Sequence, residues 1–412
     1  MGNKKFRAIK LADIERAREF LHGKITRTGV RRCPPGLDLG ETELWLKLEN
    51  EQATGSFKIR GGLNKMNSLT SEERKHGVVA SSAGNHAQGL AYAAKSLGVV
   101  AHIVMPKTTP IVKVNATRSY GAEVILHGEV YDDAYAYAKE LERDKGYVFV
   151  HPYQDSEIIA GQGTIGLEIL EDLPDLESVV VPIGGGGVIS GIATAIKAQK
   201  PDVKILGVVS NQASGMMHLF RGESEPAVDA RKRVATIAEG IAIKSPSALM
   251  FSTYISPLVD QVVEVDDNEI AQTLVFLLEK GKTVTEGAGA AGLAAIMTKK
   301  GLNLGKKSCV VLTGGNIDLN VMAKVIERGL RREHRLARFA VVCEDLPGTL
   351  NRLTNVMAEE RANVLEVYHD RVSPELGIRE TRIDLLVETA SDQHIQKIQE
   401  ALKAMGFKII RN

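Results

Sequence analysis

A lysine inside a glycine-rich segment is the first candidate for chemistry in this chain. Lys58 lies in the sequence Thr54-Gly55-Ser56-Phe57-Lys58-Ile59-Arg60-Gly61-Gly62. We expect Ser56 to cap a short helix, which places Lys58 in its first turn. The helix dipole there disfavours an ammonium group, lowers the pKa of the lysine and favours the free amine that condenses with an aldehyde. Phe57 adds a flat apolar neighbour, and the glycines let a ligand approach the backbone.

A second segment has the pattern of a phosphate-binding loop. The apolar run Val179 to Ile183 is typical of a buried parallel strand, and it leads into Gly184-Gly185-Gly186-Gly187 and a helix from Val188 to Lys200. Bare amides at a helix N-terminus bind phosphate together with the helix dipole. A dinucleotide-binding fold would need an acid at the end of the next strand. That strand, Lys204 to Val209, is followed by Ser210, so we exclude the dinucleotide interpretation.

Two further loops supply polar groups of other kinds. Ser82-Ala83-Gly84-Asn85-His86 follows a short apolar strand and opens a helix. The amides of its first turn can bind a carboxylate, and the Asn85 side chain can hydrogen-bond a phenolic oxygen. Near the C-terminal end, another apolar strand leads into Thr313-Gly314-Gly315-Asn316, where the Thr313 hydroxyl is a donor. The aldehyde, phosphate, phenolic oxygen and ring nitrogen of pyridoxal phosphate match these four groups.

With these motifs, residues of about 8 to 328 resemble the tryptophan-synthase-β-like family of pyridoxal phosphate enzymes. Within that family the chain looks like the threonine dehydratases (threonine ammonia-lyases). The resemblance implies that Lys58 carries the cofactor, that Phe57 packs against the cofactor ring and that Asn85 bonds the 3-hydroxyl group. It assigns the cofactor phosphate to the tetraglycine loop and the Val188 amide.

The resemblance also implies a reaction, the dehydration and deamination of L-threonine to 2-oxobutanoate and ammonia. The substrate carboxylate would sit on the amides of the segment Ser82 to His86, and Lys58, once freed from the cofactor, would take the Cα proton. The ring nitrogen would meet the hydroxyl of Thr313, where most relatives have serine. A neutral hydroxyl partner does not enforce a charged ring, and this favours elimination over transamination.

Two departures from the family pattern narrow the expected activity. Serine racemases of this family have a second serine, a base for the opposite face, at the position of Ala83, so we do not expect racemisation as the main activity. They also hold a divalent metal through an acid after a G-V-E motif. The matching sequence Gly207-Val208-Val209-Ser210-Asn211 has no acid, so we expect no divalent metal there. A cation held by carbonyl groups would leave no such trace.

Two acidic segments and one glycine pair add further expectations. Ala238-Glu239-Gly240-Ile241-Ala242 and Glu286-Gly287-Ala288-Gly289-Ala290 resemble family segments that face the cofactor. For Glu239 and Glu286, a role in the site and a structural ion pair remain equally open. Gly161-Gln162-Gly163-Thr164 is expected to begin a helix, with its glycines serving packing rather than chemistry.

The C-terminal part of the chain has a different character. Residues 339–412 show the order βαββαβ of a ferredoxin-like domain. The sequence Asp345-Leu346-Pro347-Gly348-Thr349-Leu350 resembles the D-x-P-G-x-L loop of ACT domains, although Gly348 can be only a turn glycine. The resemblance implies an amino-acid effector, isoleucine or valine, bound near this loop, and pairing of the domains in a homodimer or homotetramer.

Strands and helices alternate from about Glu43 to Gly329, which is the pattern of the α/β class. We predict open, mostly parallel sheets with helices on both faces, arranged as two lobes with the cofactor between them. The catalytic domain is placed at residues 1–328, with a smaller lobe at about 49–150. A linker follows at 329–338, and then comes the ACT-like regulatory domain, residues 339–412.

Composition limits the partners and the compartment. The 412 residues carry 52 basic and 51 acidic side chains, so the net charge of +1 gives no electrostatic case for nucleic acid or a membrane surface. Three scattered cysteines fit neither a metal site nor a disulfide framework. No apolar run is long enough for a membrane span, and the N-terminal residues lack the apolar segment of a secretory signal. We therefore expect a cytoplasmic enzyme.

Alternative functions remain open. A related lyase acting on L-serine, hydroxyaspartate or an O-activated serine would have the same motifs, and so would a catalytically dead amino-acid sensor.

Overall fold

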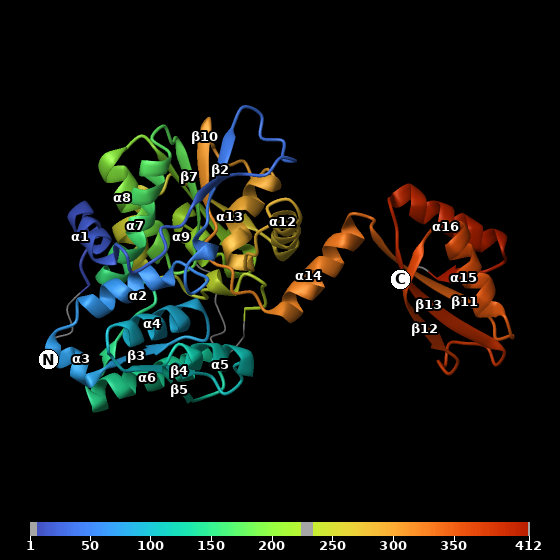
Figure 1. Ribbon diagram of the computed structural model, residues 1–412, viewed down its shortest axis with the longest axis horizontal. Coiled ribbons are helices and arrows are strands. Elements are labelled where there is room, and N and C mark those ends of the chain that lie inside the picture. The colour runs from blue at the N-terminus through green and yellow to red at the C-terminus, as the bar shows by residue number, and fades with distance from the viewer. Residues whose placement is uncertain (1–5, 224–233, 411–412) are drawn as a thin grey trace. The chain divides into compact units, whose positions relative to one another are not determined.

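The computed structural model describes residues 6–223 and 234–410. The chain divides into two compact units, Met1–Asp318 and Leu319–Asn412 (Figure 1). The division falls before helix α14 (Leu319–Arg332), whereas the sequence analysis extended the first domain to residue 328. The functional meaning of the two units stays a prediction.

The larger sheet of the first unit has six strands in the order β1-β2-β10-β7-β8-β9. Neighbours run parallel except for the antiparallel pair β1 and β2. Its strands are β1 (Val30–Arg32), β2 (Glu43–Lys47), β7 (Ser178–Pro182), β8 (Lys204–Ser210), β9 (Gln261–Val265) and β10 (Lys307–Val311).

Helices cover both faces of this larger sheet (Figure 1). On one face, side chains such as Val179 and Val181 of β7 share a buried cluster with Ile189 and Ile192 of helix α8 (Gly187–Gln199). On the other face lies α13 (Gly287–Met297), where a Cβ at Gly292 would stand 3.0 Å from Val310. Burial on both faces explains why these strands read as continuous apolar runs.

The smaller sheet of the first unit has four parallel strands in the order β5-β4-β3-β6. Val79 and Val104 pack with α6 on one face, while Ala80 and Ile103 pack with α4 and α5 on the other (Figure 1). All of it falls inside the range 49–150. The elements are β3 (Val78–Ser81), α4 (Asn85–Ser96), β4 (Ala101–Met105), α5 (Ile111–Ser119), β5 (Glu123–Leu126), α6 (Tyr131–Lys145) and β6 (Val148–Phe149).

Further helices complete the first unit. Those of six or more residues are α1 (Leu11–Leu21), α2 (Lys58–Asn67), α3 (Ser71–His76), α7 (Ser156–Asp172), α9 (Gly215–Arg221) and α12 (Asp267–Glu279). Short turns of helix are α10 (Ala248–Met250) and α11 (Ser256–Leu258). The predicted two-sheet α/β architecture is confirmed. Among the described residues, no helix combines the length and the apolar character that a membrane crossing requires.

Glycines set the close contact between α7 and α8. A Cβ at Gly163 would lie 2.9 Å from the main-chain oxygen of Gly191, and a Cβ at Gly191 would lie 2.5 Å from that of Ile159. These contacts confirm that the glycines of segment 161–164 serve packing. The predicted helix start there is wrong, because α7 begins at Ser156, where the Asp155 side chain accepts from two first-turn amides.

The second unit confirms the predicted ferredoxin-like order. Its antiparallel sheet runs β12-β13-β11-β14. Residues such as Phe339, Ile383 and Leu402 form a core between this sheet and two helices. Gly348 has φ +89°, so the turn into the first helix favours glycine there. The elements are β11 (Leu336–Glu344), α15 (Thr349–Glu359), β12 (Asn363–Asp370), β13 (Glu380–Glu388), α16 (Asp392–Ala404) and β14 (Lys408–Ile410).

Candidate active site

Lys58 is the first residue of helix α2, which confirms its expected place in the first turn of a helix. The capping prediction is wrong, because Phe57 occupies the N-cap position and Ser56 instead forms a β-bridge with Gly314. The Lys58 Nζ atom donates to the main-chain oxygen of Pro152 at 3.1 Å and lies 5.0 Å from the centroid of the Phe57 ring. The amine is therefore held by one backbone carbonyl and one aromatic face.

The surroundings of Lys58 favour its neutral amine. Burial lowers its pKa to about 8, against the opposing field of Glu286. Burial also lowers the pKa of His86 to about 3 and that of His151 to about 4, with the field of Lys58 contributing to both shifts. Both imidazoles are uncharged at neutral pH, so neither adds a positive charge beside the amine of Lys58.

Thr313 lies beside the lysine because two loops pair along their backbones. The Phe57 amide donates to the main-chain oxygen of Thr313 at 3.2 Å, and the Gly315 amide donates to that of Gly55 at 2.8 Å. Thr313 follows strand β10 and is buried. The end of one strand of the larger sheet is thereby fixed against the start of α2.

Asn85 reaches the same place from the smaller sheet. As the first residue of α4, it donates through Nδ2 to Glu286 Oε1 at 2.6 Å and accepts at Oδ1 from Asn316 Nδ2 at 2.8 Å. Burial raises the pKa of Glu286 to about 7. Glu239, by contrast, forms an ion pair with Lys113. Of the two acids left open by the sequence, Glu286 contacts a predicted site residue.

The tetraglycine loop lies between β7 and the N-terminus of α8, as expected. Gly186 has φ +88° and precedes the helix, whose first turn leaves amides such as that of Val188 without an acceptor inside the helix. A Cβ at Gly185 would stand 2.2 Å from the Tyr153 ring. Because Pro152 accepts from Lys58, the segment 152–153 connects this loop to the lysine.

Two amides of the segment 82–86 already have acceptors inside the protein, so fewer are free than expected. The Ser82 amide donates to the main-chain oxygen of Val104 at 3.3 Å, and the Gly84 amide donates to Ser82 Oγ at 3.3 Å. The Nε2 atom of His86 contacts the buried main-chain oxygen of Val150 at 3.2 Å, so this nitrogen is used inside the fold. The amides of Ala83, Asn85 and His86 remain as candidates for a carboxylate.

The residues brought together fit pyridoxal phosphate by their chemistry. An amine of lowered pKa suits an aldehyde, a glycine-rich helix N-terminus suits a phosphate, and an oriented amide suits a phenolic oxygen. No Cβ of a larger residue could enter at Gly185 or at Gly314, where it would stand 2.6 Å from Glu286 Oε1. Sequence reasoning missed Pro152 and Tyr153, which have no local signal. The sequence indicates no role for Asn316.

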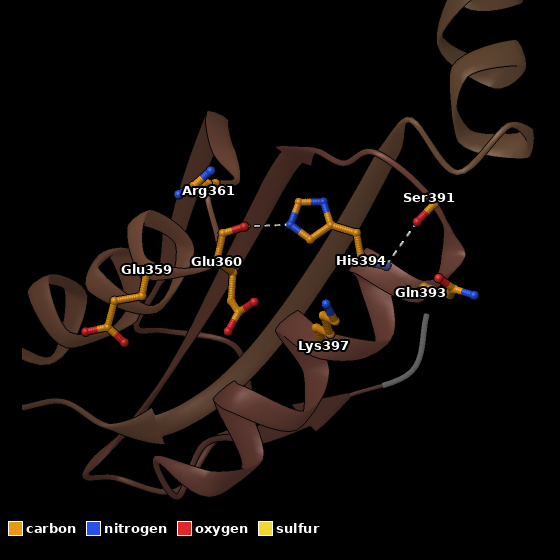
Figure 2. Close-up of a pocket in the computed structure, with 7 residues that line it drawn as sticks. All are labelled: Glu359, Glu360, Arg361, Ser391, Gln393, His394 and Lys397. Atoms are coloured by element: carbon orange, nitrogen blue, oxygen red, sulfur yellow. Dashed lines mark hydrogen bonds between the residues drawn. The ribbon is translucent and has the colours of Figure 1, made fainter.

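A separate polar pocket lies in the second unit, away from the loop 345–350. Figure 2 shows His394 aimed at the end of α15. Its Nδ1 accepts from the Ala390 amide at 3.0 Å, so Nε2 carries the proton and donates to the Glu360 main-chain oxygen at 2.7 Å. Both ring nitrogens are used inside the fold. The pocket is lined by Glu359, Glu360, Arg361, Ser391, Gln393, His394 and Lys397.

Comparisons with known proteins show the family to which the chain belongs. A sequence model of the family described as "Pyridoxal-phosphate dependent enzyme" matches residues 22–314. The L-threonine ammonia-lyase of Thermotoga maritima is 46% identical over 402 residues, 97% of this chain and 99% of that protein. The catabolic L-threonine dehydratase TdcB of Escherichia coli K12 is 42% identical over 319 residues, 77% of this chain and 96% of that protein. Maize serine racemase has a similar structure, with a TM-score of 0.71 and 32% identity over 80% of this chain and 100% of that chain.

The chain therefore belongs to the family of pyridoxal-phosphate dependent enzymes. Its cofactor is pyridoxal phosphate, and its fold is that of the threonine deaminases and serine racemases with solved structures. Among the described residues, no group of three or more His, Cys, Asp or Glu side chains could hold a metal ion. The expected absence of a divalent metal stays a prediction.

Proposed function

We propose that the protein is a threonine ammonia-lyase that converts L-threonine to 2-oxobutanoate and ammonia. The observation that carries the proposal is the half-buried amine of Lys58, with a pKa lowered to about 8, which donates to the Pro152 oxygen beside Tyr153, the residue that packs against the tetraglycine loop. Similar proteins named as threonine ammonia-lyases or dehydratases, at 42% to 46% identity, support this substrate. The preference over L-serine and hydroxyaspartate is part of the proposal.

Each residue group has a separate task in the proposed reaction. Bound pyridoxal phosphate supplies an aldehyde for the substrate amine and an acceptor for the electrons of the Cα–H bond. Lys58 holds the cofactor and then takes the Cα proton on Nζ. The loop Gly184 to Gly187 and the Val188 amide would bind the phosphate, and the Thr313 hydroxyl would meet the ring nitrogen. Phe57 would pack on the ring.

The substrate carboxylate would bind at the N-terminus of α4. The amides of Ala83, Asn85 and His86 offer donors, and the helix dipole favours an anion there. Ser82 would contribute through its hydroxyl, because its amide is engaged by Val104. Ala83 has no group able to move a proton, which supports elimination rather than racemisation.

The proposal is tested by the release of 2-oxo acid from L-threonine, L-serine and hydroxyaspartate. We expect L-threonine to give the highest kcat/KM and Lys58→Ala to lose essentially all turnover, because the amine that holds the cofactor and takes the Cα proton is then removed. Lys75→Ala is the matched control, since that lysine is on the surface helix α3, where its side chain is 77% exposed. Its kcat/KM should equal that of the parent chain.

Three results would contradict the proposal. Turnover of another amino acid without threonine would move the assignment to a related lyase. Substantial 2-oxobutanoate production by Lys58→Ala would remove the lysine from the mechanism. Cofactor binding without any turnover would favour an amino-acid sensor.

We extend the proposal to regulation. The ferredoxin-like second unit would act as an ACT-like regulatory domain that binds isoleucine or valine and pairs in a homodimer or homotetramer. Its fold order and the loop 345–350 support this assignment. Assaying the full chain with and without each amino acid, together with its mass in solution, tests both parts. A monomer without response to either effector would contradict them.

A further inference from the structure

A continuous run of side-chain hydrogen bonds passes through Asn85. Asn316 Nδ2 donates to Asn85 Oδ1 at 2.8 Å and to the main-chain oxygen of Thr54 at 2.8 Å. On its other side, Asn85 Nδ2 donates to Glu286 Oε1 at 2.6 Å. We propose that Asn316 and Glu286 are positioning residues that hold the Asn85 amide in one orientation, with an N–H left for the phenolic oxygen of the cofactor. The inference rests on the proposed role of Asn85.

The hydrogen-bonded run ends at the Thr54 main-chain oxygen and at the Glu286 carboxyl group. These end groups fix the orientation of the side-chain amides of Asn316 and Asn85 between them. A main-chain oxygen can only accept, so the atom of Asn316 that faces Thr54 is Nδ2. Both N–H groups of Asn316 are then used, one on Thr54 and one on Asn85. The Asn85 atom that faces Asn316 must accept and is Oδ1, which turns the Asn85 NH₂ group toward Glu286.

The carboxylate end agrees with this orientation above the raised pKa of Glu286, about 7. An ionised Glu286 can only accept, so it requires the NH₂ group of Asn85 on its side. One of the two N–H bonds of Asn85 goes to Glu286, and the other stays available for a ligand. A flipped Asn85 would present its carbonyl oxygen to Glu286 and to the phenolic oxygen, opposing acceptor to acceptor in both places.

The backbone leaves room for this arrangement only because of two glycines. At Gly55, with φ +69°, a Cβ would lie 2.4 Å from Asn316 Oδ1. At Gly314, a Cβ would lie 2.6 Å from Glu286 Oε1 and 3.1 Å from Asn85 Nδ2. The Gly315 amide donates to the Gly55 oxygen at 2.8 Å, and the Glu286 amide donates to the Gly314 oxygen at 2.9 Å. The segments that carry Asn316 and Glu286 are thus tied to each other.

The experiment compares Asn316→Ala, Asn85→Ala and the double variant in the full-length chain. One readout is the concentration of pyridoxal phosphate that half-saturates protein stripped of cofactor. The other is the ratio of the visible to the near-ultraviolet absorption band of the bound cofactor at fixed pH, which reports the hydrogen bonding of its phenolic oxygen. We expect Asn316→Ala to weaken binding roughly twofold to tenfold, the loss of about one net hydrogen bond.

The direction of the Asn316→Ala effect and its coupling to Asn85→Ala distinguish a positioning role of Asn316 from a merely structural one. Asn316→Ala should shift the band ratio in the same direction as Asn85→Ala, and it should add nothing in the Asn85→Ala background. Asn50→Ala is the matched control. Asn50 is a buried asparagine that donates to Thr283 Oγ1 at 2.8 Å and to the Val284 oxygen at 2.9 Å, and this variant should keep both readouts.

Isosteric variants test the same chemistry without a change of shape. Asn316→Asp removes both donated hydrogen bonds and should behave at least as badly as Asn316→Ala. Glu286→Gln keeps an acceptor for Asn85 and should retain the parent band ratio, whereas Glu286→Ala should not. Melting curves identify any variant that fails to fold. For such a variant, the isosteric substitution at the same residue tests the positioning role instead.

Three outcomes would overturn the inference. If the readouts change in Asn85→Ala but not in Asn316→Ala, or if the effects are additive in the double variant, only the positioning role is overturned. Unchanged readouts in Asn85→Ala would remove the proposed role of Asn85 and the inference with it. None of these results would affect the requirement for Lys58.

Discussion

Lys58 combines a position in the first turn of a helix with a partly desolvated side chain. Its pKa falls from 10.5 to about 8, and burial is the first cause. At pH 8 about half of such amines are neutral, compared with roughly 0.4% for an ordinary lysine of pKa near 10.4. In the proposed reaction this larger neutral fraction would help Lys58 to react with an aldehyde.

This shift predicts a pH profile for cofactor attachment. The rate at which full-length protein stripped of cofactor is labelled by pyridoxal phosphate and borohydride at Lys58 should rise with a midpoint near pH 8. A midpoint close to the ordinary lysine value would contradict the assigned environment. Because the unfolded chain binds the extra proton between about pH 8 and 10.5, the unfolding free energy contributed by Lys58 rises across that window and is lost as pH falls through 8.

At the scale of elements, a buried ion network fixes α2 beside its neighbours. Arg60, fully buried, donates to Glu49 Oε2 at 2.8 Å and to Glu168 Oε1 at 2.6 Å. Lys47 of β2 donates to Glu168 Oε2 at 2.6 Å. Two cations thus face two carboxylates, and the network joins α2, two residues after Lys58, to β2 and α7.

Breaking this network should destabilise the fold strongly. Arg60→Met leaves two buried carboxylates with one lysine, and we expect a loss of about 3–5 kcal/mol in the free energy of unfolding. Arg143→Met, which removes a surface pair with Asp144, should cost less than about 0.5 kcal/mol. Urea unfolding measures both. A loss below about 1 kcal/mol in Arg60→Met would show that the network does not hold α2.

The segments that carry a local pattern could be predicted from the sequence, and the contacts between them could not. The apolar run, the four glycines and the helical pattern that begins at Val188 predicted β7, its loop and α8 to within a residue or two. Ser56 was misplaced as a cap, because its pairing with Gly314 is a contact distant in the chain. Pro152 carries no signal, since only its carbonyl is used and every residue has one.

At the scale of the whole molecule, each unit has its own hydrophobic core. The cluster around Phe339 and Leu353 contains only residues of the second unit, and the clusters around Ile189 and Leu90 contain only residues of the first. The E. coli dehydratase matches 77% of this chain with 96% of its own length, so an enzyme of the family exists with little beyond the matched part.

This organisation predicts the result of truncation. A chain of residues 1–318 should fold, bind pyridoxal phosphate and keep threonine turnover within about threefold, because the candidate site lies wholly in the first unit. It should lose any response to isoleucine or valine. A truncated chain that still responds would place the effector site in the first unit, and one that cannot bind the cofactor would contradict the independence of the two cores.

The most direct test of the account is chemical trapping of the cofactor on the full-length protein. Reduction of the cofactor-loaded protein with borohydride, followed by digestion and peptide mass spectrometry, reports the lysine that holds pyridoxal phosphate. We predict the pyridoxyl group on Lys58, within the peptide that contains Phe57, and none on Lys58→Ala. A label on another lysine, or loaded protein without any label, would contradict the assignment of the active site.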